Sequence, residues 1–119
     1  MAADTTINLV INQKASFFAT FVMKDSSGNV YDLSNSSACA RYNSSYEASE
    51  DSAQEFTTAI PVGTDGAITI ALDAEATAAL DQNVKYVYDV IVTNNDTQFK
   101  TRIVQGAIKV SPGVTPVDC

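Results

Sequence analysis

The side chains able to perform chemistry are few in this sequence, and no pattern among them is typical of an enzyme. Histidine is absent, which removes the commonest general base and the usual zinc ligand. Cys39 and Cys119 have no histidine to activate a thiolate, and we expect Cys39 to be a small buried or edge side chain. No glycine-rich phosphate loop occurs, and nothing marks a pair of carboxylates for acid–base work. The sequence therefore predicts a non-enzymatic protein without a cofactor.

Four carboxylates gather in a polar segment near the middle of the chain: Glu47, Glu50, Asp51 and Glu55. Oxygen ligands of this kind suit a hard cation such as Ca²⁺. Their spacing matches no known cation-binding loop. We therefore expect an exposed acidic loop without a metal, and a cation site is the open alternative.

Two cations, Lys100 and Arg102, have the same parity and are expected to project from one face of the last hairpin. They are candidates for contact with an acidic patch on a partner, and the alternative is an exposed edge kept soluble by its charge. Three further residues complete the candidate interface. Tyr46 is included because tyrosines anchor interfaces, and Val114 and Pro116 because they follow the last strand toward a neighbour.

Length and charge limit the classes of protein and of partner. A chain of 119 residues with 45% hydrophobic residues suits one domain with a real core, and we expect a single domain over residues 1–119 with short N- and C-terminal arms. A net charge of −7 disfavours nucleic acid and anionic membranes as partners. No segment reaches the roughly 20 apolar residues of a membrane-spanning helix. The first residues do not resemble a secretory signal, so we expect synthesis in a cytosol.

Alternating apolar residues predict the short strands that must position these candidates. The strands are expected at residues 5–13, 15–24, 30–33, 38–42, 55–60, 67–72, 84–93 and 101–110. One short helical turn is predicted at 73–80, where Asp73 is a suitable N-cap and alanines supply helix propensity. A tight turn is predicted at 94–96. Regularly spaced short strands of this kind are typical of an all-β, antiparallel, immunoglobulin-like β-sandwich, here with about seven to nine strands.

The last strand changes the parity of its apolar residues. Phe99 and Ile103 share one parity, whereas Val104, Gly106 and Ile108 share the other. A strand that switches its buried face needs a bulge or a bend. We predict this irregularity between Ile103 and Gly106.

Several segments together resemble a group of tailed-phage virion proteins that contain small immunoglobulin-like domains. The resemblance covers most of residues 7–115 and is carried by 15–18, 24–28 with 31–33, 76–80, 86–90 and 103–112. The last of these, Ile-Val-Gln-Gly-Ala-Ile-Lys-Val-Ser-Pro, is the most specific. In pattern the chain is also similar to the N-terminal domain of phage baseplate upper proteins, although the tryptophan often seen near Met23 is missing.

The resemblance implies a structural protein of a virion that is assembled in the host cytoplasm. A free-standing module of this size favours a capsid decoration or cement protein, present in many copies, with the major capsid protein as its partner. One alternative is a tail, neck or baseplate component of the same fold. Another, from a different class, is a carbohydrate-binding or adhesion module, although the sequence has no tryptophan to stack on a sugar.

Overall fold

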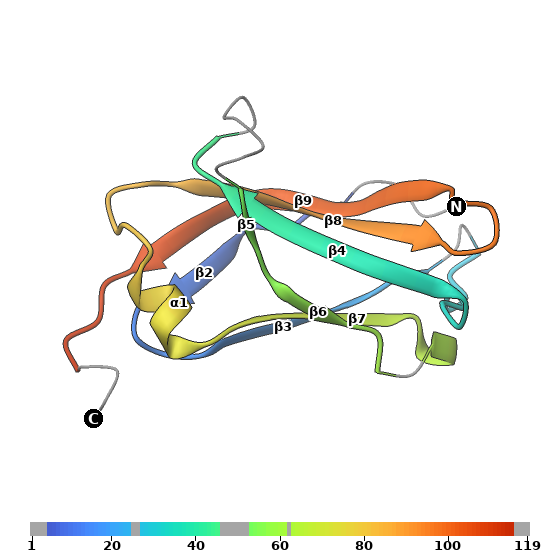
Figure 1. Cartoon of the computed structure of the whole chain (residues 1–119), viewed down its shortest axis with the longest axis horizontal. Coiled ribbons are helices and arrows are strands. Elements are labelled where there is room, and N and C mark those ends of the chain that lie inside the picture. Colours follow the sequence, from blue (N-terminus) through green and yellow to red (C-terminus); the bar gives the residue numbers. More distant parts are fainter. Residues whose placement is uncertain (1–4, 25–26, 46–52, 62, 116–119) are drawn as a thin grey trace.

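The computed structural model describes residues 5–24, 27–45, 53–61 and 63–115. These residues form two β-sheets that pack face to face (Figure 1). The larger sheet has the strand order β1-β9-β8-β4-β5, with β2 also paired to β9, and the smaller sheet has the order β3-β7-β6. The predicted all-β, immunoglobulin-like sandwich is confirmed.

Nine strands and one short helix follow one another along the described residues. The strands are β1 (Thr5–Thr6), β2 (Leu9–Asn12), β3 (Phe17–Val22), β4 (Ser36–Asn43), β5 (Gln54–Glu55), β6 (Thr57–Ala59), β7 (Ala67–Leu72), β8 (Tyr86–Asn94) and β9 (Lys100–Ser111), and the helix is α1 (Ala74–Ala78). A 3₁₀ turn at Gly63–Asp65 leads into β7.

The core lies between the sheets and is built from the inward residues of each strand. The predicted alternation on β7 and β8 is confirmed: the inward side chains of β7 (Ile68, Ile70, Leu72) are buried, as are three of the four expected inward on β8 (Tyr88, Val90, Val92). The fourth, Tyr86, is partly buried and packs against the core. Aromatic rings join the two sheets at the centre. The ring centroids of Tyr42 and Phe56 lie 5.0 Å apart, and those of Phe56 and Tyr88 lie 6.3 Å apart in an edge-on arrangement.

The predicted irregularity in the last strand is confirmed as a β-bulge. Val90 of β8 lies opposite Val104, but the next residue, Ile91, lies opposite Arg102. Ile103 is therefore the extra residue. Both Ile103 and Val104 are buried, each 4% exposed. The bulge lets β9 present apolar residues to the core on both sides of the parity change.

The N-terminal strand predicted at 5–13 is divided into β1 and β2, and both run parallel to β9. Between them the chain lies against the middle of β9. The Tyr88 hydroxyl donates to the Ile7 carbonyl at 2.6 Å, and the Ala107 N–H donates to the Asn8 side chain at 3.0 Å. Gly106 permits this approach, because a Cβ there would lie 2.7 Å from the Ile7 carbonyl carbon and closer still to its oxygen.

The strand predicted at 55–60 is also divided, and its two parts belong to different sheets. β5 pairs with β4 of the larger sheet, and β6 pairs with β7 of the smaller one. Phe56 lies between them, buried in the core at 4% exposure. Its N–H donates to the Ala40 carbonyl at 3.0 Å, so the crossing between sheets keeps its backbone bonded.

The strand predicted at 30–33 is wrong. Val30 forms only an isolated bridge with Lys24. The Asp32 carboxylate then accepts the Ser34 N–H at 2.9 Å, and it also accepts the Ser34 hydroxyl, which favours a turn over an extended chain. Leu33 is buried at 1% exposure, so its apolar character reflects a loop residue that fills the core.

The predicted helical turn and its cap are confirmed. The Asp73 carboxylate accepts the Ala76 N–H at 2.8 Å, as an N-cap should. Leu80, which follows α1, is buried in the core. The sequence did not single out Thr77, whose side chain is fully buried and donates to the Ala15 carbonyl at 2.9 Å. This bond ties α1 to the start of β3.

The connection between β8 and β9 is longer than the predicted tight turn at 94–96. The Asn94 side chain accepts the N–H groups of Asp96 and Thr97 at 2.9 and 3.2 Å. The left-handed residue is Gln98, with φ of 61°, rather than an asparagine or aspartate. β9 starts at Lys100, which fixes where the candidate cations lie.

Candidate interaction surface

The outer face of the larger sheet brings together the candidate cations Lys100 and Arg102. In the register of β8 and β9, Lys100 lies opposite Thr93, and Arg102 lies opposite Ile91. Both cations are exposed on the surface of the sheet. A third cation, Arg41 of β4, lies opposite Asp89 of β8 on the same face. Two strands, β4 and β9, therefore supply one cluster of positive side chains, and β8 lies between them.

Each cation of this cluster has a polar neighbour on the sheet. Arg41 Nη2 lies 2.9 Å from Glu55 Oε1, and Arg102 Nη1 lies 3.8 Å from Asp89 Oδ2. The Lys100 ammonium donates to the Thr93 hydroxyl at 3.2 Å. Because the three cations face two carboxylates, this cluster is positive, whereas the whole chain carries −7.

Asp89 is the carboxylate at the centre of the cluster, and its side chain is one-third exposed. Burial raises the pKa of Asp89 above its usual value, and the nearby Arg102 guanidinium only partly opposes that rise. The face therefore becomes more positive as pH falls through the titration of this group.

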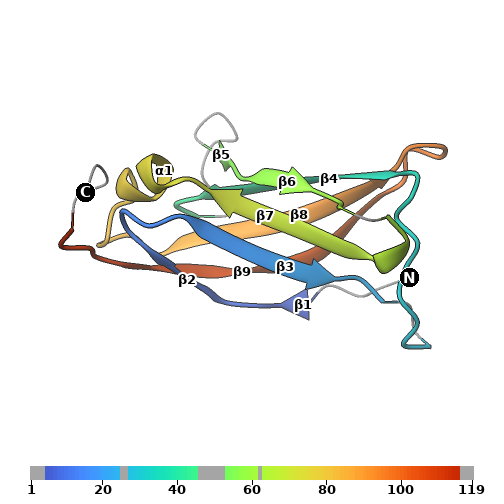
Figure 2. The same cartoon turned by 90° about the horizontal axis from the view of Figure 1, so that it is seen from below.

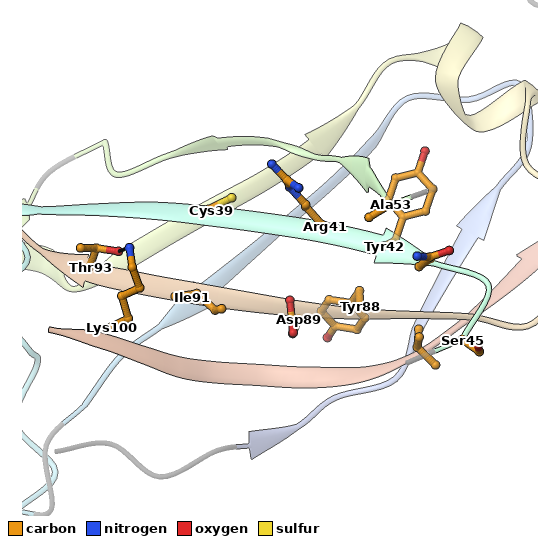
Figure 3. Close-up of a pocket in the computed structure, with 12 residues that line it drawn as sticks. Cys39, Arg41, Tyr42, Ser45, Ala53, Tyr88, Asp89, Ile91, Thr93 and Lys100 are labelled. Atoms are coloured by element: carbon orange, nitrogen blue, oxygen red, sulfur yellow. Dashed lines mark hydrogen bonds between the residues drawn. The ribbon is translucent and has the colours of Figure 1, made fainter. Parts of the chain in front are cut away.

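A shallow depression of about 410 Å³ lies on the same face, lined by residues of β4, β8 and β9 (Figure 3). The Arg41, Asp89 and Lys100 side chains border it, and Ile91 supplies an apolar part of its floor. Cys39 also lines the depression and is exposed. Of the two expectations for this thiol, the buried one is wrong, whereas the edge one agrees with its place on β4, where β8 is paired and β5 is not. A surface with guanidinium and ammonium donors around a partly apolar floor suits the recognition of carboxylate side chains on a partner.

The remaining candidate residues are separated from this cluster or lie outside the described residues. Val114 is 96% exposed and follows the end of β9. Tyr46 and Pro116 lie outside the described residues. Their part in an interface stays a prediction.

The acidic segment is only partly described. Glu55 pairs with Arg41, whereas Glu47, Glu50 and Asp51 lie outside the described residues. In the described part of the chain, no three His, Cys, Asp or Glu side chains are grouped to hold a metal ion. None of the helices described there has the length and apolar character that crossing a membrane requires.

Sequence reasoning missed Arg41, Asp89 and Thr93 as neighbours of the two cations. The hairpin from β8 to β9 offered one signal, since residues just before and just after a turn pair with each other. The pairing of Arg41 with Asp89 offered none, because the register between β4 and β8 depends on a connection of more than forty residues that includes other strands.

Comparisons with known proteins add no family to this description. No protein-family model matches the sequence, and no curated protein matches it either.

Proposed function

We propose that this chain is a non-enzymatic structural protein of a virion, and specifically a capsid decoration protein that binds the major capsid protein. The sandwich fold agrees with the fold that the resemblance implies. The virion setting itself is supported by the sequence segments that carry the resemblance, above all residues 103–112.

The observation that carries the binding role is the positive cluster of Arg41, Lys100 and Arg102 on one face of an acidic chain. Because most of the surface of such a chain repels acidic partners, this face is where an acidic protein surface is attracted. The depression beside the cluster offers a concave surface in which a side chain of the partner can lie. Attachment through a sheet face needs no catalytic group and no cofactor.

Binding of the purified chain to empty shells of the major capsid protein tests this function. We expect saturable binding that weakens as salt rises, since exposed charges are screened. Lys100→Glu with Arg102→Glu should abolish it. Lys24→Glu is the control for a reversed charge elsewhere, because Lys24 is an exposed cation just beyond the end of β3, which belongs to the other sheet.

The number of copies in purified particles separates the proposal from its closest alternative. A copy for every capsid subunit or capsomer supports decoration of the head. A small number fixed by the rotational symmetry of a tail would overturn the capsid assignment in favour of a tail or baseplate component. Binding to glycans by the purified chain, without binding to shells, would favour an adhesion module.

A further inference from the structure

β3 is an edge strand of the smaller sheet, and it has few of the features that keep edge strands from pairing with another chain. On one side β3 pairs with β7, and among the described residues no strand pairs with its other side. Figure 2 draws β1 and β2 below that edge, but these two strands pair with β9. In natural proteins, charged residues, prolines or bulges keep edge strands from pairing with other chains. From Ala15 to Met23 the sequence contains no charged residue and no proline, and the ladder with β7 has no break.

The backbone groups at this edge point outward in a regular pattern. The Met23 N–H donates to the Gly66 carbonyl at 2.8 Å, which continues the ladder between β3 and β7. In an antiparallel ladder the backbone groups of alternate residues point to opposite sides. Those of Phe18, Thr20 and Val22 therefore face the open edge, where no backbone hydrogen bond joins them to another described residue.

The side chains at this edge are complementary to the same side chains of a second copy. In an antiparallel pairing with a two-fold axis at Thr20, Phe18 of one copy lies opposite Val22 of the other, and the same pair repeats across the axis. Phe18 is 68% exposed and Val22 is 52% exposed. Pairs of an aromatic and a β-branched residue are favourable across strands. The three opposed pairs would exchange about six backbone hydrogen bonds.

The distribution of charge favours a second copy of this chain as the partner of the open edge of β3. The chain carries −7, so two copies repel over most of their surfaces. The outer face of the small sheet contains no charged residue: it consists of Phe18, Thr20 and Val22 of β3, Ala67, Thr69 and Ala71 of β7, and Thr57 and Ala59 of β6. The charged residues that flank β3 in the described chain are Lys14 and Lys24. Among the described residues, the pairing therefore brings no two carboxylates together.

We propose that β3 pairs with β3 of a second copy in antiparallel fashion, about a two-fold axis at Thr20, to form one continuous sheet β6-β7-β3-β3-β7-β6. The contact uses one strand from each copy and is smaller than a standard interface of about 1,600 Å², so dimers form only at high concentration. This pairing does not rest on the proposed function, because it is measured on the purified chain alone.

Sedimentation of the chain up to millimolar concentration tests for the dimer. We expect a concentration-dependent dimer that Thr20→Pro weakens at least about tenfold, because proline removes the N–H directed at the open edge and leaves the bonds to β7 in place. Val22→Lys should weaken it similarly. The matched control is Val10→Lys, which places the same charge at an exposed valine (59%) on β2 of the other sheet. Far-UV circular dichroism verifies that each variant is folded.

Cross-linking tests the register. In a chain with Cys39→Ser and Cys119→Ser, Thr20→Cys places two thiols opposite each other at the axis, within the Cα separation that a disulfide bridges. We expect this variant to form a covalent dimer under mild oxidation. Thr69→Cys, its neighbour on β7, should not. A wild-type chain that stays monomeric throughout, or a Thr20→Cys variant that cross-links no faster than the Thr69→Cys control, would overturn the pairing. A dimer weakened equally by Val10→Lys would place the contact elsewhere and refute it too.

Discussion

Replacing Gly106 with alanine tests whether the close approach of the N-terminal strands to β9 stabilises the fold. Gly106 has no positive φ, so alanine suits its backbone. The added Cβ, however, would lie 2.7 Å from the Ile7 carbonyl carbon and 3.2 Å from Tyr88 Cε1. Since the nearest atoms belong to the backbone, relief requires the segment between β1 and β2 to move away from β9.

The expected cost follows from the hydrogen bonds that this movement would break. They are the bonds from Tyr88 Oη to the Ile7 carbonyl (2.6 Å), from the Ile7 N–H to the Gln105 carbonyl (2.9 Å) and from the Ala107 N–H to the Asn8 side chain (3.0 Å). At about 1 kcal/mol each they amount to about 3 kcal/mol. Alanine also lowers the entropy of the unfolded chain, which offsets this cost in the free energy of unfolding by about 0.4–1 kcal/mol. Gly106→Ala should therefore lower the free energy of unfolding by about 2–3 kcal/mol.

Urea unfolding followed by circular dichroism and tyrosine fluorescence measures this loss, because the chain has no tryptophan. Tyr88→Phe removes one of the three bonds directly. Since both substitutions remove the same bond, the double variant should be less destabilised than the sum of the two by about 1 kcal/mol. Gly28→Ala is the control, because its cost arises from a φ of 85° and no heavy atom lies near its Cβ position; its effect should add to that of Tyr88→Phe. A Gly106→Ala variant within about 0.5 kcal/mol of wild type, or strict additivity with Tyr88→Phe, would refute the reasoning.

Three further predictions concern single side chains. Asp73→Ala removes the acceptor of the Ala76 N–H and should cost about 0.5–2 kcal/mol in urea unfolding; an unchanged midpoint would contradict the cap. Thr77→Val keeps the shape but removes the bond to the Ala15 carbonyl, and the melting temperature should fall by an amount equivalent to about 1 kcal/mol, whereas Thr77→Ser should restore most of it. Burial raises the pKa of Asp89, so the folded chain keeps this proton to a higher pH than the unfolded chain, and stability falls as pH rises through that window. Asp89→Asn should therefore be more stable relative to wild type at neutral pH than at about pH 3; a difference independent of pH would contradict the assigned shift.

The sequence predicts the long, regular strands well, because one buried face imposes a period of two on their residues. β7, β8 and the second half of β9 follow this rule. The bulge at Ile103 was predictable for the same reason, since a buried strand whose apolar residues change parity must contain a bulge or a bend. The cap at Asp73 needed only local chemistry.

Other features depend on contacts that are distant in the sequence and leave no local pattern. β5 and β6 are too short to show a period, so the crossing of Phe56 between sheets resembled one weak strand. Leu33 was assigned to a strand because burial in a loop and burial in a strand select the same residue type. The positive cluster combines residues of β4, β8 and β9, and only the register of the sheet shows that Arg41 and Asp89 belong with Lys100 and Arg102.

The parallel pairing of β1 and β2 with β9 determines how the molecule responds to mechanical force. β1 begins beside Val104 of β9, and β2 ends beside Ser111, the last residue of β9 (Figure 2). A pull between Thr5 and Ser111 therefore loads the hydrogen bonds of this ladder in shear, all at the same time. In a hairpin such as β8–β9, a pull at the two open ends would break the bonds one after another. Rupture under load is governed by the rate of unfolding, so Gly106, which lets β1 and β2 lie against β9, is also a residue on which mechanical strength along the chain depends.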